Sequence, residues 1–286
     1  MKYKLLGNSG LRVSELALGT MTFGTEWGWG ADKAESQKIF DTYANNGGNF
    51  IDTANRYTEG TSERFVGDFI KEDRDHFVLA TKYTLFDKTG DPNYAGNHRK
   101  NMMRSVEASL KRLQTDYIDL LWVHAWDFIT PIEEIMRGLN DLIALGKVHY
   151  IGISDTPAWV VAQANTIAAF RGWSPFVALQ AEYNLLKRDV ERDLMPMAQS
   201  LGLALTPWAP LAGGALTGKY LNGDQGRVSA SNPRRSERAL EITKGVVKIA
   251  EELGTSPATL AIRWTMQKEL VSIPLVGARR KEQMIA

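Results

Sequence analysis

Four side chains that can move protons lie in the first half of the chain, and three of them directly follow short apolar runs. Asp52 follows Phe50 and Ile51, Lys82 follows residues 79–81, and His124 follows residues 121–123. Tyr57 comes five residues after Asp52, in a polar stretch. Short apolar runs of this kind are typical of buried parallel strands. We therefore expect an acid, a base and an imidazole at the ends of three successive strands, with a phenol in the loop beside them.

This set of side chains could reduce a carbonyl group, a reaction that needs hydride at carbon and a proton at oxygen. Tyr57 is a suitable acid because a free phenol, with a pKa of about 10, is protonated near neutral pH. A neighbouring cation favours phenolate and so strengthens the donor, and Lys82 is the candidate cation. Lys82 would lose its proton on burial without a counterion, which Asp52 can supply. His124 is then left to hydrogen-bond the substrate oxygen.

The elements that must position these residues alternate regularly along the chain. An N-terminal hairpin is expected from residues 3–6 and 12–14, joined by a glycine-containing turn. Strands are expected at residues 16–20, 49–52, 77–81, 118–123, 150–153, 177–180, 203–206 and 271–274. Helices are expected at residues 32–46, 61–70, 99–113, 132–145, 157–170, 189–201, 236–253 and 257–267. Thr156-Pro157 and Ser256-Pro257 are typical of helix starts.

Eight strands alternating with helices fit either a closed barrel or a doubly wound sheet. The sequence has neither G-x-G-x-x-G after its first strand nor a G-x-x-x-x-G-K-[ST] phosphate loop. We therefore predict an α/β fold, a (β/α)8 TIM barrel with an N-terminal β-hairpin, and one domain over residues 1–286. Active sites of such barrels lie at the carboxyl ends of the strands. Neighbouring strands are about 4.8 Å apart. Asp52, Lys82 and His124 should thus lie within roughly 10 Å of one another.

Composition excludes several classes of function. With 44% hydrophobic and 23% charged residues, the chain of 286 residues is typical of a globular protein with a sizeable core. Its 34 Lys and Arg nearly balance 33 Asp and Glu, which gives no electrostatic case for nucleic acid or a membrane as partner. Without cysteine there are no disulfides, thiolate metal sites or thiol nucleophiles. No metal site is predicted, and lacking a signal peptide or an apolar span the protein is expected in the cytoplasm.

Motifs along the whole chain resemble the aldo-keto reductase family. They are Leu18-Gly19-Thr20-Met21, Asp52-Thr53-Ala54 with Tyr57, Thr81-Lys82, His124, Gly152-Ile153-Ser154, Gln180 with Tyr183-Asn184-Leu185, and Pro207-Trp208-Ala209-Pro210-Leu211. The resemblance implies a barrel that binds NADPH or NADP+ and reduces an aldehyde or ketone to an alcohol, with a small carbonyl or alcohol compound as substrate. It is strongest to bacterial members related to potassium-channel beta subunits, although those subunits carry Asn where this chain has His124. A homo-oligomer is compatible with this assignment.

The resemblance also implies which residues meet the cofactor. Trp208 would stack on the nicotinamide, while Ser154 and Gln180 would hold its carboxamide. The family usually has Asn or Arg at the position of Asp155. An ionised Asp155 can accept a hydrogen bond from the carboxamide but cannot donate one, so the resemblance implies its role less directly than that of Ser154. The cofactor-binding residues implied are Thr20, Met21, Asp52, Ser154, Asp155, Gln180, Trp208, Ala209, Pro210, Leu211, Gly213, Lys219, Arg227, Gly277, Arg279 and Gln283.

Two basic regions are candidates for the phosphates. The glycines around Gly213 would let backbone N–H groups approach a pyrophosphate, with Lys219 as countercharge, although a plain loop would look the same. Arg279 and Arg280 suit a 2′-phosphate, and Gln283 matches the family's adenosine contact. Because the chain stops at Ala286, inside a helix that the family continues, we expect the C-terminal segment to be incomplete.

Aromatic residues are expected around the substrate pocket, in the loops after the first, third and fourth strands. They are Trp27, Trp29, Phe86, Tyr94, Trp126 and Phe128. Two other functions stay open from the sequence. One is a cofactor-binding regulatory module like the channel beta subunits, against which His124 argues. The other is a lyase with Lys82 as Schiff-base amine, which borohydride trapping with substrate would detect.

Overall fold

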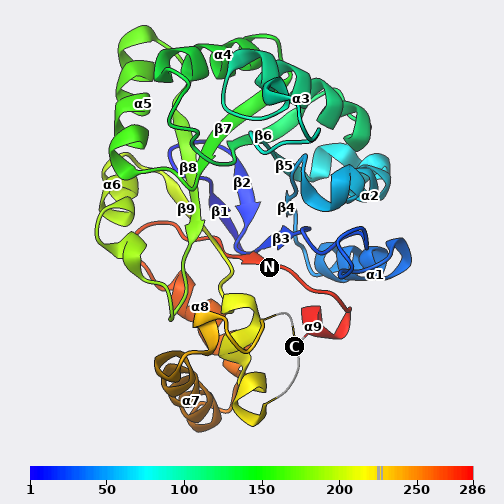
Figure 1. Ribbon diagram of the computed structural model, residues 1–286, viewed down its shortest axis with the longest axis vertical. Coiled ribbons are helices and arrows are strands. Elements are labelled where there is room, and N and C mark those ends of the chain that lie inside the picture. The colour runs from blue at the N-terminus through cyan, green and yellow to red at the C-terminus, as the bar shows by residue number, and fades with distance from the viewer. Residues whose placement is uncertain (224–225, 227, 286) are drawn as a thin grey trace.

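The computed structural model describes residues 1–223, 226 and 228–285. Its centre is a parallel sheet of eight strands in the order β10-β3-β4-β5-β6-β7-β8-β9, surrounded by helices (Figure 1). The strands are β3 (Ala17–Gly19), β4 (Phe50–Asp52), β5 (Val78–Tyr83), β6 (Ile118–Val123), β7 (Val148–Ser154), β8 (Phe176–Glu182), β9 (Ala204–Trp208) and β10 (Leu275–Val276). The helices are α1 (Lys33–Asn45), α2 (Thr61–Ile70), α3 (Arg99–Leu113), α4 (Ile132–Ala144), α5 (Ala158–Arg171), α6 (Leu194–Ser200), α7 (Glu237–Glu252), α8 (Pro257–Met266) and α9 (Glu282–Ile285).

The sheet closes on itself through residues 271–276. On one side Leu205 of β9 donates to Val271 O at 2.8 Å and accepts from Ile273 N at 2.8 Å. On the other side β10 pairs with β3. This closure confirms the predicted (β/α)8 barrel. The predicted position of the eighth strand, residues 271–274, is wrong, because residues 271–273 make only an isolated bridge and Pro274 has no N–H to extend it.

The N-terminal hairpin is confirmed and closes the amino end of the barrel. Strands β1 (Tyr3–Leu5) and β2 (Arg12–Ser14) pair in antiparallel register. Leu6 and Val13 are fully buried in one cluster with Phe50 and Trp122, which point into the barrel. Because apolar side chains seal this end, only the carboxyl ends of the strands remain for a functional site.

Helices α2 and α3 occupy the predicted residues, whereas two helix starts differ. The Thr156 hydroxyl donates to Ser154 O at 2.7 Å and caps nothing, so its predicted role is wrong and α5 begins after Pro157. Ser256 does cap α8, accepting from Thr259 N at 3.0 Å. The helix expected over residues 189–201 is broken, because Asp193 caps a new start at α6. None of the described helices has both the length and the apolar character needed to cross a membrane.

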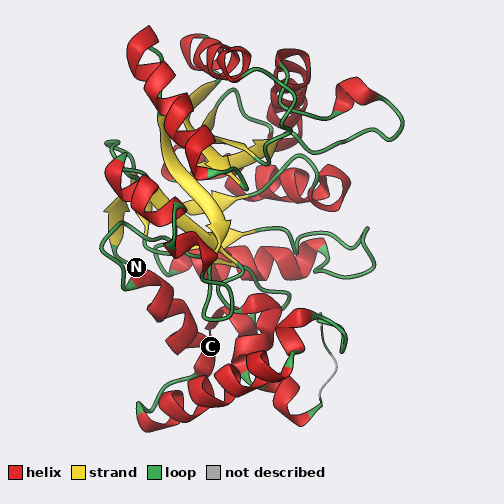
Figure 2. Ribbon diagram, turned by 60° about the vertical axis from the view of Figure 1, so that its left-hand side comes forward, coloured by secondary structure: helices red, strands yellow, loops and turns green. Residues whose placement is uncertain are grey.

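A lobe of helices follows β9 and has a small core of its own. It contains α7, α8 and short 3-10 turns, including η5 (Ala212–Thr217), η6 (Lys219–Asn222) and η7 (Pro233–Arg235). Its apolar cluster includes Leu216, Tyr220, Val246 and Ala261. Both ribbon views place this lobe beyond the end of β9, next to the mouth of the barrel (Figures 1 and 2). The lobe can therefore form one wall of a site at that mouth.

A buried carboxylate ties the element behind Tyr57 to the strand that carries Lys82. Glu63 of α2 is 0% exposed and accepts from the Thr81 hydroxyl of β5 at 2.6 Å. Its other oxygen accepts from Arg112 Nε of α3, also at 2.6 Å. Because both oxygens are bonded, Glu63 fixes α2 against β5 and α3.

Removing Arg112 should destabilise the fold. Arg112→Ala leaves the Glu63 carboxylate without its cation, and breaking a buried pair of this kind costs about 3 kcal/mol of the free energy of unfolding. Urea unfolding followed by circular dichroism measures the loss. The control is Lys111→Ala, since Lys111 is exposed on the same helix. Equal stabilities of the two variants would contradict a structural role for the Glu63–Arg112 pair.

Candidate active site

A buried ion pair lies at the carboxyl ends of β4 and β5. The side chains of Lys82 and Asp52 are only 0% and 2% exposed, and the ammonium donates directly to the carboxylate. Lys82 Nζ also donates to Thr53 O at 2.8 Å and to the Tyr57 hydroxyl at 3.1 Å. These three acceptors use all three protons of an ammonium group. The surroundings of Lys82 therefore favour its charged form.

The pKa values of the pair reflect a contest between burial and attraction. Burial pulls the pKa of Lys82 down, but Asp52 and Tyr57 more than compensate, so the Lys82 pKa lies above its ordinary value. For Asp52 the sign is reversed, because burial of a carboxylate raises its pKa, and Lys82 and Gln180 oppose that rise. Gln180 Nε2 donates to the second Asp52 oxygen at 3.0 Å. Each charge is thus held by hydrogen bonds as well as by its partner.

Tyr57 stays protonated in this environment. Burial raises the pKa of the Tyr57 phenol, and Lys82 opposes that rise. The lowering expected from the neighbouring cation is therefore present but smaller than the effect of burial. Lys82 Nζ lies 4.7 Å from the centroid of the phenol ring. An acid for carbonyl reduction has to hold its proton until the reaction, and Tyr57 does so here.

The turn that carries Tyr57 has an unusual backbone. Thr58, Glu59 and Gly60 have φ values of 46°, 56° and 81°, all in the left-handed region. A β-branched residue rarely adopts this conformation. Thr58 is held in it because its hydroxyl donates to Phe23 O at 2.6 Å and accepts from Ser62 N at 3.2 Å. The sequence offers no signal for this turn except Gly60, so the contacts of Thr58 were missed.

His124 directly follows β6 and faces the phenol. The ring centroids of His124 and Tyr57 lie 6.0 Å apart at 82°. Nδ1 of His124 is buried and has no hydrogen-bond partner among the described residues. Burial holds the pKa of His124 well below its ordinary value, and the Lys82 charge lowers it further. A neutral imidazole can still form a hydrogen bond with a polar substrate atom through a ring nitrogen that faces the mouth beside Tyr57.

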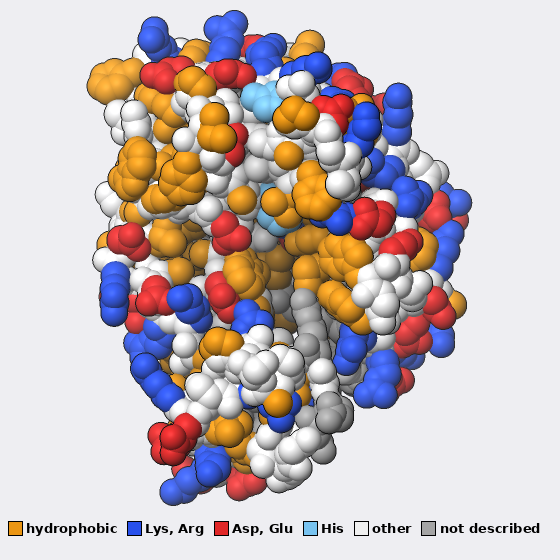
Figure 3. All heavy atoms as spheres, viewed as in Figure 1, with side chains coloured by type: hydrophobic (Ala, Val, Ile, Leu, Met, Phe, Trp, Pro, Cys, Tyr) orange, Lys and Arg blue, Asp and Glu red, His pale blue; other side chains and the backbone are white. Residues whose placement is uncertain are grey.

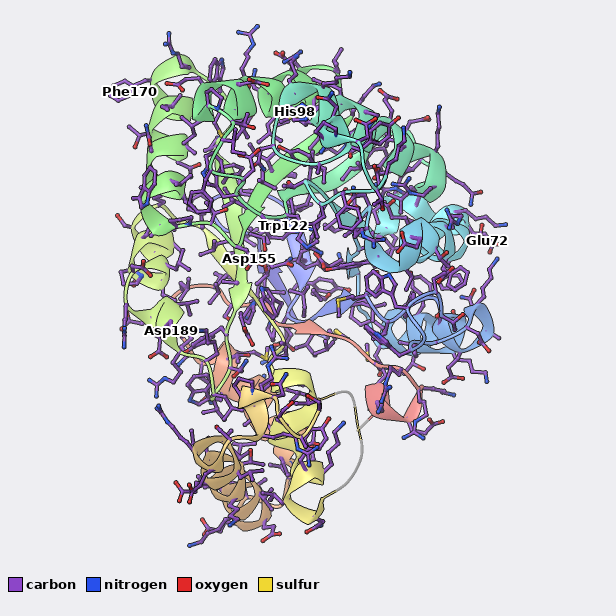
Figure 4. All side chains as sticks on the ribbon, viewed as in Figure 1. Glu72, His98, Trp122, Asp155, Phe170 and Asp189 are labelled. Carbon is purple, nitrogen blue, oxygen red and sulfur yellow. The ribbon has the colours of Figure 1, made fainter. Side chains whose placement is uncertain are left out.

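Ser154, Asp155, Gln180 and Trp208 lie on the neighbouring strand ends. Ser154 and Gln180 are register partners on β7 and β8, and Trp208 ends β9. Asp155 has a φ of 41° and accepts from Trp208 Nε1 at 3.2 Å. In the view of Figure 4, Asp155 lies toward the middle of the molecule, whereas Phe170 and Asp189 lie at its periphery. The structure thus brings these four residues to the mouth that holds Asp52.

Thr20 and Met21 lie after β3, on the other side of Asp52. Thr20 is fully buried, and its hydroxyl donates to Asp52 O at 3.0 Å. The Ser62 hydroxyl lies 2.8 Å from the Thr20 hydroxyl and 2.9 Å from that of Thr53. Met21 is partly exposed. Thr20 therefore supports the backbone of Asp52, and Ser62, which sequence reasoning missed, holds Thr20 and Thr53.

The residues expected near the pyrophosphate lie between β9 and the lobe. Residues 209–211 make this connection, and Gly213 has a left-handed φ of 68°. Lys219 is partly exposed, with its Nζ 4.8 Å from the centroid of the Tyr220 ring. Arg227 lies outside the described residues. A cofactor role for these residues stays a prediction.

The residues expected near the adenosine follow β10. Gly277 lies against β3, since a Cβ there would be 3.1 Å from Gly19 O. Gln283 Oε1 accepts from Arg279 N at 2.9 Å, which turns the backbone into α9. Arg279 is partly exposed and Arg280 is exposed. Both cations are accessible to a ligand, but no contact with the Asp52–Lys82 pair links them to the centre of the site.

An aromatic rim surrounds Tyr57. The Trp27 ring lies edge-on to Tyr57, with centroids 6.5 Å apart. Arg56 lies 5.8 Å from the Trp27 ring and 4.6 Å from the Phe86 ring, and it pairs with Glu59, which also accepts from Trp27 Nε1. In the space-filling view, a hollow at the centre of the molecule is lined mainly by hydrophobic side chains, with a histidine on its edge (Figure 3). The part of Arg56 in holding two loops together was missed from the sequence.

The other expected aromatics differ in their positions. Trp29 lies beside Trp27, with ring centroids 5.9 Å apart. Trp126 packs on the core, whereas Phe128 is 71% exposed. Tyr94 stacks on Arg104 of α3 at 4.0 Å and lines a polar cavity of about 180 Å³ together with Arg56 and Glu59. Tyr94 is thus linked to the rim of Trp27 and Phe86 through Arg56.

Residues 15–286 match the family model described as the aldo/keto reductase family. The chain belongs to this family. It is 42% identical to an aryl-alcohol dehydrogenase [NADP(+)] of Phanerodontia chrysosporium, over 99% of this chain and 80% of that protein. It is 41% identical to a norsolorinic acid reductase of Aspergillus flavus, over 98% of this chain and 74% of that protein. A putative aryl-alcohol dehydrogenase of Saccharomyces cerevisiae is 40% identical over 96% of this chain and 78% of that protein.

Membership of this family makes the protein an enzyme of the aldo/keto reductase class, and the first of these relatives carries NADP(+) in its name. These relatives are fungal, so the expected relation to bacterial members and channel beta subunits has no support among them. The site fits the cofactor, since the partly exposed indole of Trp208 offers a flat surface near the ion pair. Glycines with a left-handed backbone, such as Gly213, and the accessible cations Lys219 and Arg279 suit the phosphates of a dinucleotide that extends from this centre.

The protonation state of His124 in this aldo/keto reductase can be tested directly. Because burial and Lys82 depress its pKa, the His124 ring should stay neutral as the pH falls through about 6.5, the ordinary histidine value. Histidine ring resonances in a heteronuclear NMR titration report the state, and His124→Gln assigns the signal. A His124 midpoint at or above about 6.5 would contradict a neutral imidazole.

Proposed function

We propose that this aldo/keto reductase reduces aromatic aldehydes or ketones with NADPH, and that Tyr57 donates the proton. The observation that carries the proposal is the position of Lys82 Nζ, which bonds Asp52 and lies 3.1 Å from the Tyr57 hydroxyl. An acid, the cation that stabilises its conjugate base and the anion that keeps the cation charged are thereby in direct contact.

In the proposed reaction, bound NADPH supplies hydride to the carbonyl carbon. Tyr57 transfers its O–H proton to the carbonyl oxygen, which leaves a phenolate beside the Lys82 ammonium. The negative charge on Tyr57 then has a cation at hydrogen-bond distance, so the transition state is stabilised more than the neutral ground state. Asp52 keeps Lys82 charged before and after this step. Solvent returns the proton to Tyr57 when the alcohol leaves.

His124 and the aromatic rim support the choice of substrate class. A neutral His124 can hydrogen-bond the carbonyl oxygen and orient it toward Tyr57. Trp27 and Phe86 offer flat apolar surfaces on which an aryl ring can pack, with offset or edge-on geometry. The aryl-alcohol dehydrogenase and norsolorinic acid reductase similar to this chain carry names of aromatic compounds. These observations together favour aryl carbonyl compounds.

The contacts of Lys82 weigh against lyase chemistry. A Schiff base needs a neutral amine with a free electron pair. Lys82 instead makes three hydrogen bonds as a donor, and its pKa is raised. Borohydride with substrate should therefore leave Lys82 unmodified.

Tyr57→Phe should remove the proton donor and little else. We expect turnover with an aryl aldehyde to fall by roughly 10²-fold or more, while NADPH affinity stays within about twofold. The assay is loss of NADPH absorbance, with affinity taken from fluorescence titration. Tyr150→Phe is the matched control, since Tyr150 lies on β7 away from the ion pair. Near-normal turnover of Tyr57→Phe would exclude Tyr57 as the acid.

The pairing of Asp52 with Lys82 predicts a specific change in the pH profile. In Asp52→Asn, burial is no longer opposed by the carboxylate, so the Lys82 pKa should fall and the amine should become neutral as pH rises. The value of kcat should drop roughly 10-fold or more at high pH and recover in part at low pH. Lys82→Met cannot regain a proton and should show no recovery.

The measurement is kcat against pH for the wild type and both variants. A uniform loss across pH in Asp52→Asn would mean that Asp52 acts by position and not by charge. The acid role of Tyr57 would then still be judged by Tyr57→Phe alone.

A further inference from the structure

Asp155 is the second carboxylate at the barrel mouth, and its setting differs from that of Asp52. It directly follows β7 with a φ of 41°, so its backbone is held in the left-handed region. Its Oδ1 accepts from Trp208 Nε1 at 3.2 Å, and its side chain is exposed at the mouth. The carboxylate thus reaches the edge of the one indole ring that ends β9.

The charges around Asp155 do not cancel. Asp52 is neutralised by Lys82, and Glu182 of β8 is paired with Arg234 of the lobe. His124 is neutral because its pKa is depressed. Within the described part of the chain, Asp155 forms no ion pair. Among the described carboxylates Asp52, Glu182 and Asp155, it is Asp155 that has no ion-pair partner, and it lies next to Trp208.

The chemistry of the reaction limits where the nicotinamide ring can lie. The carbonyl oxygen must come within about 3 Å of the Tyr57 hydroxyl, and the hydride donor within about 3.5 Å of the carbonyl carbon. With a C=O bond of about 1.2 Å, the reacting ring carbon lies at most roughly 8 Å from the Tyr57 oxygen. Asp155 lies close enough to Tyr57 for its charge to raise the pKa of the phenol, and Trp208 is hydrogen-bonded to Asp155. The Asp155–Trp208 pair is therefore a candidate boundary of this region.

We propose that Asp155 sets the charge around the nicotinamide and orients Trp208, which makes it a positioning residue for hydride transfer. The assignment rests on the proposed function. With NADPH bound, hydride transfer would leave a positive charge on the nicotinamide ring, which was neutral before the step. An uncompensated carboxylate beside the ring stabilises that charge as it develops and binds NADP+ more tightly than NADPH. The hydrogen bond to Trp208 keeps the carboxylate and the indole in one fixed arrangement.

The effect should depend on pH with a definite sign. Partial burial raises the pKa of Asp155, Glu182 raises it further, and the Trp208 hydrogen bond and Lys82 oppose the rise. Other charged or titratable groups of the described mouth are Tyr57, Asp52, His124, Arg234, Lys219 and the paired Arg56 and Glu59. Preference for NADP+ is present while Asp155 is ionised and is lost as the pH falls through its pKa.

Dissociation constants for NADP+ and NADPH, measured on the whole protein by tryptophan fluorescence or calorimetry at pH 8 and at successively lower pH, test the assignment. Asp155→Asn removes the charge but keeps an oxygen that can accept from Trp208. At pH 8 it should weaken NADP+ relative to NADPH by about tenfold, as expected for one unit charge about 5 Å away in a partly solvated site. As the pH is lowered and Asp155 takes up its proton, the wild type should approach the variant. Asp116→Asn, at an exposed position, is the control.

Asp155→Ala separates orientation from charge. It removes the acceptor of the Trp208 hydrogen bond as well, so hydride transfer in a single turnover should be slower than in Asp155→Asn. Rates equal to those of Asp155→Asn would overturn the orienting role.

Failure of this assignment and failure of the proposed function give different results. If the wild type binds both nucleotides and Asp155→Asn leaves their affinity ratio unchanged, the charge-setting role of Asp155 is overturned and the proposed function stands. If the wild type binds neither nucleotide, the proposed function fails and takes the assignment with it.

Discussion

Burying an ammonium and a carboxylate together sets the strictest condition on this molecule. Each ion loses several kcal/mol of hydration, and their attraction compensates only when every donor and acceptor is satisfied. Lys82 therefore requires three acceptors in fixed places, and Asp52 requires a donor at each oxygen. Thr53 O, the Tyr57 hydroxyl and Gln180 meet these needs. A displacement of any of them would leave a buried charge with an unmet hydrogen bond. The ion pair therefore restricts the positions of these three groups.

The barrel meets this condition by drawing on segments that are distant in sequence. Gln180 lies 128 positions from Asp52, yet β8 and β4 both open onto the same mouth. On the outer side of β4, the hydroxyls of Thr20, Ser62 and Thr53 bond one another and the backbone of Asp52. Apolar side chains from the hairpin fill the opposite end. The apolar packing at the amino end and the hydroxyl hydrogen bonds around β4 together fix the position of the ion pair along the barrel axis.

Much of this arrangement could be predicted because strand ends leave a local signature. An apolar run followed by a polar residue is enough to place Asp52, Lys82 and His124, since parallel strands of a barrel end on one face. The predicted bounds of two elements were wrong because a single residue changed the local hydrogen bonding. Pro274 shifted the eighth strand, and Asp193 divided a helix.

Contacts between distant segments could not be predicted in the same way. Neither the bond from Gln180 to Asp52 nor the one from Trp208 to Asp155 has any trace in local periodicity. The left-handed Thr58 even contradicts the ordinary preference of its residue type, because tertiary hydrogen bonds outweigh the local strain.

Two carboxylates at one mouth can have separate effects because their surroundings differ. The field of Asp52 is largely cancelled by Lys82, so a charge that appears on a bound molecule interacts with the pair mainly as with a dipole. Asp155 has no such partner among the described residues, and its field reaches the mouth, reduced only by solvent. A change at Asp155 therefore alters how the site responds to charge on a cofactor ring, and it also removes one of the smaller effects that raise the pKa of Tyr57. A change at Asp52 acts more directly on the proton donor, because Asp52 bonds Lys82 and Lys82 bonds the Tyr57 hydroxyl.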